Sequence, residues 1–328
     1  MQRLDIYNSD LDRVLSIFTW ISLLWEDEYN GYGNFLLELQ QTDQLGTLIR
    51  PDMFVMADDC NKPMIITSIV VENNTIVAKG HLATYLLTKR VSDTVIANTN
   101  AESAMRGLVN NMSPFVGLSL GDLKNIPDVF AAQTSDQSVF EYCRIISEYA
   151  DVGFYIRKQN KTLLFECYKP GLNANAKYAV KYGNLGEISY TNSVADFYNV
   201  AIVAGMGEGD DRITVTVGDT ASSSYGRAEM YVDAKDLQQE EGQSQQDYLD
   251  TLRLRGLESL AEVGAIENVE FNVDDDRSKL GDIITVLLDE LGINLVARVT
   301  KLSIKSQRNT ITKSITVGKP IKILRGRN

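Results

Sequence analysis

Short strands follow one another almost without interruption from Leu4 to Arg90 of this 328-residue chain. Alternating apolar positions and β-branched residues predict strands at Leu4–Tyr7, Leu11–Ile17, Ser22–Tyr29, Asn34–Leu39, Met53–Met56, Met64–Val71 and Thr75–His81. Turn signals such as Asn30-Gly31 and Asn73-Asn74 separate them. Connections this short leave no room for a helical layer, so this stretch predicts a small antiparallel barrel or sandwich.

The pattern changes after Arg90. Helical spacing predicts a helix over Ala101–Asn111 with Asn100 as its N-cap, and a stronger one over Ser138–Tyr149. Two strands, Gly153–Lys158 and Thr162–Tyr168, follow directly. We therefore expect residues 97–185 to form an α/β insertion.

Strands return after residue 186 and continue to the end of the chain. They are predicted at Ile188–Asn192, Tyr198–Gly205, Arg212–Val217, Glu229–Val232, Glu267–Val273, Ile283–Asp289, Ile293–Ser303 and Asn309–Val317. An apolar stripe predicts one helix among them, at residues 244–263. The expected fold is mainly β, with an α+β insertion. It has a first barrel at 1–96, the α/β domain at 97–185 and a second barrel at 186–328 that carries the inserted helix.

The net charge of −12 excludes some functions. A nucleic-acid-binding surface needs clustered lysine and arginine, whereas a negative pore wall facing DNA would prevent sticking. The first residues lead directly into a strand pattern, and no apolar stretch reaches transmembrane length. We expect a chain made in the cytoplasm, without a signal peptide or membrane span.

Residues that carry catalysis or metal binding are sparse. Cys60, Cys143 and Cys167 are widely spaced, and His81 is the only histidine, so neither a zinc site nor a nucleophile–histidine pair is expected. The predicted metal, cofactor and catalytic sets are therefore empty.

Three motifs are weighed against this expectation. Glu26 and Glu28 share one face of a strand, which favours a solvated face or an interface over a pair of catalytic carboxylates. Asp274–Asp276 is acidic but lacks the spacing of a calcium-binding loop. Gly205–Gly209 precedes a strand and not a helix, which predicts a flexible hairpin instead of a dinucleotide loop.

Three motifs follow one another in the chain: the strand–glycine turn–strand of Ile21–Glu38, the strand-to-helix corner of Lys79–Arg90 and the hairpin of Ser278–Arg298. In this order they resemble the patterns of the siphophage tail hub family, which in many phages of Gram-positive bacteria is the N-terminal part of the tail-associated lysin. Gly318 closes the last strand as the family's final glycine does. The resemblance covers nearly the whole chain.

The resemblance implies two barrel-like domains and a homotrimer whose six barrels form a pseudo-sixfold ring that continues the tail tube. The expected partners are the distal tail protein above and receptor-binding or fibre proteins below, with the tape measure protein as a further candidate. DNA would pass through the lumen without specific binding, and the protein would reside in the virion, at the tail tip or baseplate. The chain stops at Asn328 without the lytic extension of longer members, so no enzymatic activity is expected.

Two sets of barrel residues are the candidates for ring contacts, with ordinary core or edge packing as the equal alternative. These candidates are Trp25, Tyr29, Tyr32, Gly281, Asp282 and Arg298, the last three within the final hairpin. Two rival functions stay open. One is the hub of a contractile tail, bacteriocin particle or secretion-system spike. The other is a cell-wall-degrading tail enzyme that acts through Glu26, Glu28 or Asp274–Asp276.

Overall fold

The chain divides into two compact units, which are described separately below. Unit 1 comprises residues 1–189 and 269–318, and unit 2 comprises residues 190–268. The computed structural model describes residues 2–92, 96–115, 117–132, 137–218, 226–239, 242–263, 266–274, 276–307 and 310–318.

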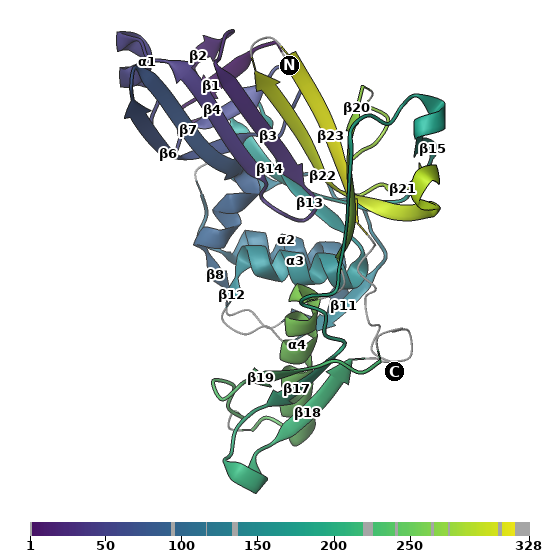
Figure 1. Cartoon of the computed structure of the whole chain (residues 1–328). Helices are drawn as coiled ribbons and strands as arrows, with labels where there is room; N and C mark the ends of the chain where they lie inside the picture. Colours follow the sequence, from purple (N-terminus) through teal and green to yellow (C-terminus); the bar gives the residue numbers. More distant parts are fainter. Residues whose placement is uncertain are drawn as a thin grey trace. The chain divides into compact units, whose positions relative to one another are not determined.

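Strands make up most of unit 1, whereas unit 2 combines three short strands with one long helix (Figure 1). The strands of unit 1 are β1 Leu4–Tyr7, β2 Arg13–Ile17, β3 Ser22–Glu28, β4 Asn34–Gln40, β5 Phe54–Ala57, β6 Met64–Glu72, β7 Thr75–Leu82, β8 Val91–Ser92, β9 Ile96–Asn100, β10 Leu118–Leu120, β11 Val129–Ala132, β12 Gln137–Ser138, β13 Gly153–Gln159, β14 Thr162–Tyr168, β15 Leu172–Ala179, β21 Ile283–Leu288, β22 Ile293–Gln307 and β23 Thr310–Gly318. Two further strands, β16 Ile188–Ser193 and β20 Ile266–Val273, run across the boundary between the two units. Its helices are α1 Asp43–Leu48, α2 Ala101–Asn111 and α3 Val139–Ala150, with the short 3₁₀ helices η1 Ala83–Lys89, η2 Val180–Tyr182 and η4 Asp289–Leu291. Unit 2 contains β17 Val200–Ala204, β18 Thr214–Gly218, β19 Glu229–Asp233, η3 Gly209–Asp211 and α4 Gln245–Glu262.

One 13-stranded sheet joins the first and last strands of the chain. Its main path runs β16-β20-β23-β22-β3-β4-β7-β6-β5-β1-β2, and β21 joins it beside β22 and carries β15 on its other side. The two halves meet where β22 pairs antiparallel with β3, with Ser303 opposite Glu26. The two barrel-like halves are therefore hydrogen-bonded to each other, a pairing between distant segments that strand patterns alone do not reveal.

The first half encloses its own core because its strands alternate strictly. Leu23 and Trp25 of β3, with Phe35 and Leu37 of β4, point inward and are almost fully buried, while their neighbours in sequence point to the other face. The Asn73-Asn74 turn has positive φ at both residues, 49° and 63°, as a two-residue hairpin loop requires. Burial of this apolar face is what stabilises the half-barrel.

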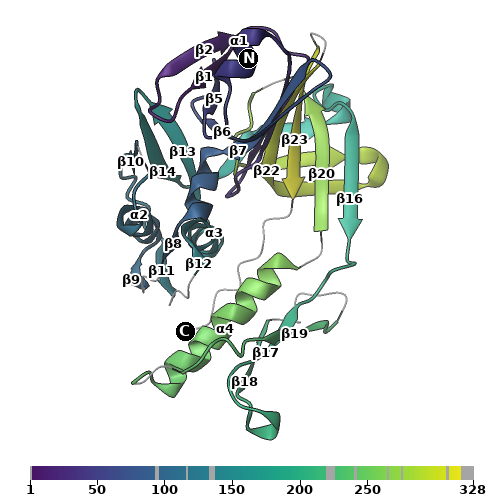
Figure 2. The same ribbon diagram turned by 90° about the vertical axis from the view of Figure 1, so that its left-hand side faces the viewer.

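The α/β segment packs two helices against the three-stranded sheet β10-β14-β13 (Figure 2). Side chains cap both helices: Asn100, the predicted cap, accepts from the N–H of Ser103, and Ser138 accepts from the N–H of Glu141. Glu102, in the first turn of α2, is fully buried and accepts two backbone N–H groups of the following loop, at 2.7 and 3.1 Å. A buried carboxylate therefore holds a loop that has no regular structure.

Unit 2 is a small sheet of order β18-β17-β19 with α4 on one face. Ser244 caps α4 by accepting from the N–H of Asp247. Gly256 allows the helix to lie close to the sheet, since an added Cβ would come within 2.5 Å of Val217 and 2.6 Å of Val203. Tyr248 and Leu252 fill the space between helix and sheet.

The mainly β fold class with a helix-containing α/β part is confirmed. The structure groups the residues differently from the three predicted segments, however. The helix at 245–262 lies with β17–β19 in unit 2 and not within a barrel, because its apolar stripe packs on those strands. Residues 172–179, expected in the α/β insertion, form β15, which pairs with β21 of the large sheet.

Candidate functional site

Four of the six predicted contact residues meet at one junction inside unit 1. Arg298 of β22 is 8% exposed, and its guanidinium donates to the carbonyl oxygen of Gly281 at 2.7 Å and to Oδ1 of Asp151 at 2.6 Å. Asp151 ends α3 in the left-handed conformation. The same guanidinium lies 4.9 Å from the ring centroid of Tyr29. One side chain thus connects the first barrel, the α/β segment and the last hairpin.

Tyr29 forms the aromatic part of this junction. Its ring meets that of Tyr168 edge to face, at a centroid distance of 6.4 Å, and the Tyr168 hydroxyl donates to the carbonyl of Leu280. Burial raises the pKa of Tyr29 to about 12, although Arg298 opposes the shift. The Tyr29 hydroxyl is buried without a hydrogen-bond partner among the described residues. The contacts of Tyr29 therefore join segments of its own chain.

The turn at Gly281 and Asp282 completes the junction. Gly281 has a φ of +87°, and an added Cβ would lie 2.8 Å from a ring carbon of Tyr29. Oδ2 of Asp282 accepts from the side-chain amide of Asn173 at 2.8 Å and from the N–H of Lys279 at 3.0 Å. Both residues therefore shape the entry to β21.

The structure places the other two predicted contact residues elsewhere. Tyr32 packs against the rings of His81, Tyr85 and Phe140, at centroid distances of 5.1 to 5.5 Å. Trp25 lies in the core of the first half-barrel, 3% exposed, edge to face with Phe35. Trp25 thus has the core packing that was the alternative to a ring contact. A ring-contact role for the six residues stays a prediction.

Glu26 and Glu28 lie side by side on β3, opposite Ser303 and Lys301 of β22. Oε1 of Glu26 lies 3.3 Å from Nζ of Lys301 and accepts from the Ser303 hydroxyl at 3.2 Å, while Oε2 accepts from the amide of Asn34. Desolvation raises the pKa of Glu28, and the nearby Glu26 adds to this shift while Lys301 opposes it. These carboxylates are neighbours on one sheet face, and they do not face each other across a cleft as a glycosidase pair would.

The remaining motifs have structural surroundings. Asp276 pairs with Lys313, whereas Asp275 lies outside the described residues. Within the described ranges, no group of three or more histidine, cysteine or acidic side chains is close enough to hold a metal. Residues 205–209 connect the antiparallel strands β17 and β18, as a hairpin should. Nδ1 of His81 lies 2.8 Å from the carbonyl oxygen of Gly33, and Cys143 and Cys167 are fully buried.

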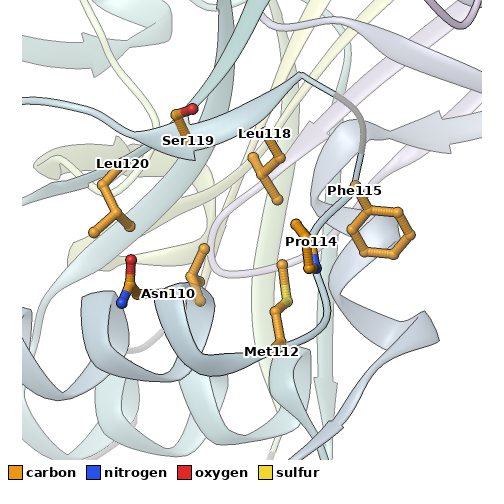
Figure 3. A pocket seen from close by; sticks show the side chains of 8 residues that line it. Asn110, Met112, Pro114, Phe115, Leu118, Ser119 and Leu120 are labelled. Atoms are coloured by element: carbon orange, nitrogen blue, oxygen red, sulfur yellow. The ribbon is translucent and has the colours of Figure 1, made fainter.

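A pocket of about 310 Å³ opens between the end of α2 and β10 (Figure 3). Its lining is mostly apolar: Val109, Asn110, Met112, Pro114, Phe115, Leu118, Ser119 and Leu120. Leu118 and Leu120 come from the strand, and Asn110 comes from the helix on the opposite side. None of the eight is titratable, so they supply no acid, base or nucleophile.

Sequence reasoning missed which strand edges of the large sheet stay open. Among the described residues, β2 pairs only with β1 and β15 pairs only with β21. Only Met64 and Ile65 of β6 pair with β5, and β7 is the only described strand that pairs with the rest of β6. Val70 and Val71 of this free part are 43% and 48% exposed. At one end of the sheet path, β16 has β20 as its only described neighbour. Such uncharged edges can pair with another strand, and the alternating pattern of a strand does not tell which edge stays open.

The chain matches the family described as Siphovirus ReqiPepy6 Gp37-like protein over residues 3–319. No curated protein matches it. Within the described ranges, no helix has both the length and the apolar character needed to span a membrane.

Solved structures share the fold at low sequence identity. The 43 kDa tail protein of prophage MuSo2 from Shewanella oneidensis matches with a TM-score of 0.61 and 11% identity, covering 97% of this chain and 98% of that one. Prophage tail protein gp18 from Listeria monocytogenes EGD-e matches with a TM-score of 0.57 and 12% identity, covering 97% and 94%. The E. coli c3393 protein, a type VI secretion component described as similar to T4 tail proteins gp27 and gp5, matches with a TM-score of 0.51 and 12% identity, covering 99% and 78%. The chain belongs to the Siphovirus ReqiPepy6 Gp37-like protein family and has the fold of phage tail proteins.

Proposed function

We propose that this protein is the hub of a siphophage tail tip or baseplate. It acts as a structural element without catalysis. Three copies form a ring whose six barrel-like halves continue the tail tube. The distal tail protein binds above the ring, receptor-binding or fibre proteins bind below it, and the tape measure protein is a further candidate partner. Membership of a siphovirus family and the fold of tail proteins support this proposal.

The observation that carries the ring is that one sheet has open edges on different strands, among them the free part of β6 and the strand β16. The free part of β6 and the strand β16 lie at different places along the sheet path, so they are different surfaces of one chain. An edge that pairs with a different edge of the next copy makes a head-to-tail contact, which closes into a ring when the rotation allows it. Three such contacts pair the β6 edge and the β16 edge of every chain.

The net charge of −12 suits passage of DNA through such a ring. A negative wall repels phosphate groups and keeps the polymer from sticking. DNA is thus a passing polymer in this proposal and not a bound ligand.

A second candidate is the hub of a contractile tail, bacteriocin particle or secretion spike. It is favoured by the fold shared with a secretion-system component. The discriminating observation is a spike protein that docks onto the ring.

An enzymatic role is tested by a zymogram on Gram-positive cell walls, in which lysis that disappears in Glu26→Gln would overturn the structural proposal.

The ring is tested with a backbone change in the free part of β6. Glu72 and Thr75 flank the two-residue turn and form a hydrogen-bonded pair, so the next pair, Val71 and Ile76, is not hydrogen-bonded. The N–H of Val71 therefore points away from β7. Val71→Pro therefore removes an outward donor, whereas the control Val71→Thr keeps the donor and the branched shape.

Native mass spectrometry and negative-stain imaging over a concentration series measure the outcome. We expect trimeric rings for the natural chain and for Val71→Thr, and monomers for Val71→Pro with an unchanged circular dichroism spectrum. A natural chain that stays monomeric at every concentration and binds no tail-tip protein would refute the hub. Rings that form equally well with Val71→Pro would refute the role of this edge.

A further inference from the structure

An exposed aromatic ring stands on the sheet face of unit 2 that lies opposite α4. Met230 and Val232 of β19 pack in the core beneath the helix, so the residue between them points to the other face. That residue is Tyr231, which is 61% exposed. It lies in one cross-strand row with Ile202 of β17 and Thr216 of β18.

The hydroxyl end of this ring is held in place. Arg212 donates from Nη1 to the Tyr231 hydroxyl at 2.7 Å. The guanidinium is itself anchored by the carbonyl oxygens of Ala204 and Gly205, at 2.8 and 3.0 Å, and by the carboxylate of Asp233. An exposed ring that is already oriented loses little conformational freedom when a partner stacks on it.

The charges beside the ring are balanced within the face. Arg212 pairs with Asp233, and Arg227 pairs with Glu229. Each arginine described on this face is thus neutralised by an acidic neighbour, which disfavours a phosphate-bearing partner. The two threonines of β18, Thr214 and Thr216, add exposed hydroxyls. The face therefore complements a neutral partner that is rich in hydrogen-bonding groups.

We propose that this face binds a neutral saccharide, with one pyranose ring stacked on Tyr231. The flat faces of a pyranose are largely C–H groups, which pack on an aromatic ring, while its hydroxyls hydrogen-bond to carboxylates and threonines. Asp233 lies two residues along β19 from Tyr231, on the same face of the sheet, and Thr216 lies in the same cross-strand row, two strands away. This binding goes beyond the hub function and does not depend on ring formation, because every residue named lies in unit 2 of one chain.

The test uses the full chain on an array of neutral mono- to hexasaccharides, followed by calorimetric titration with the saccharide that gives the strongest signal. Tyr231→Ala is expected to weaken binding at least tenfold. Tyr231→Phe, which keeps the ring, is expected to stay within about threefold of the natural chain. Tyr182→Ala is the matched control, because Tyr182 is similarly exposed, at 55%, and lies in unit 1.

Two results would overturn the proposal. The first is an array on which no neutral saccharide is bound. The second is a Tyr231→Ala variant that binds saccharide as tightly as the natural chain. If that variant also changes the oligomeric state in sedimentation, the face is a protein contact. An unchanged thermal unfolding midpoint confirms that each variant is folded.

Discussion

Replacing Arg298 by methionine is expected to lower the free energy of unfolding of unit 1 by about 2–4 kcal/mol. Arg298 holds the junction at which the first barrel, the α/β segment and the last hairpin meet. Methionine keeps an apolar stem of similar length, so the loss comes from the guanidinium and not from a cavity.

The magnitude follows from the three contacts of the guanidinium. The carbonyl of Gly281 loses a buried donor that carries a charge, which costs roughly 1.5–3 kcal/mol. The ring of Tyr29 loses a cation at 4.9 Å, worth about 0.5–1 kcal/mol. The side chain of Asp151 is 37% exposed and can be rehydrated, so the loss of this ion pair adds less than about 1 kcal/mol.

Urea unfolding followed by circular dichroism measures the change. Arg298→Lys keeps the charge but not the two-pronged geometry, and we expect an intermediate loss. Arg227→Met removes an exposed ion pair in unit 2 and serves as the matched control, with a change within about 0.5 kcal/mol. An Arg298→Met variant as stable as this control would refute the argument that Arg298 holds the junction together.

Three further predictions concern single buried groups. The pKa of Tyr29 is about 12 in the folded chain against 10.0 for a free tyrosine, so the unfolded chain ionises first. The free energy of unfolding should therefore fall by up to about 2–3 kcal/mol between pH 10 and 12, and Tyr29→Phe should remove that part of the loss in urea titrations at each pH. Gly281→Ala should lower the free energy of unfolding by about 1–3 kcal/mol more than Gly292→Ala. Both glycines have positive φ, but only at Gly281 would an added Cβ lie within 3 Å of a ring, that of Tyr29. Equal urea midpoints for the two variants would contradict this. Glu102→Ala should lower the free energy of unfolding by about 2–4 kcal/mol and speed hydrogen exchange of the two backbone N–H groups that bond to Glu102, and Glu102→Gln should have an intermediate effect. Unchanged exchange would contradict the role of Glu102 in holding this loop.

Local structure was largely predictable from the residues. The strands at Leu4–Tyr7 and Thr162–Tyr168 and the helix at Ala101–Asn111 have the predicted bounds, and Asn100, Ser138 and Ser244 cap their helices. These features depend on side-chain alternation and on contacts a few residues apart, which a sequence displays directly. The short helix α1 at Asp43–Leu48 was missed, since six residues carry too little of a helical pattern to be recognised.

The junction was predictable only in part. Tyr29, Gly281, Asp282 and Arg298 were selected from two phrases that resemble a family, and the structure brings them together. Their partner Asp151 carried no signal, because its role depends on where α3 ends in space. Trp25 was selected by the same reasoning and lies in the core instead, since residue type does not tell an exposed tryptophan from a buried one.

The sequence by itself determined that this chain is mainly β, which segments are strands, and that the α/β insertion separates two runs of them. It also carried the family phrases, which a match over residues 3–319 bears out. Only the tertiary structure decided that β3 pairs with β22, that α4 packs on β17–β19 instead of belonging to a barrel, and that the edges of β6 and β16 stay open. The physical reason is that alternation fixes the faces of a strand, whereas its neighbours depend on contacts between residues hundreds of positions apart.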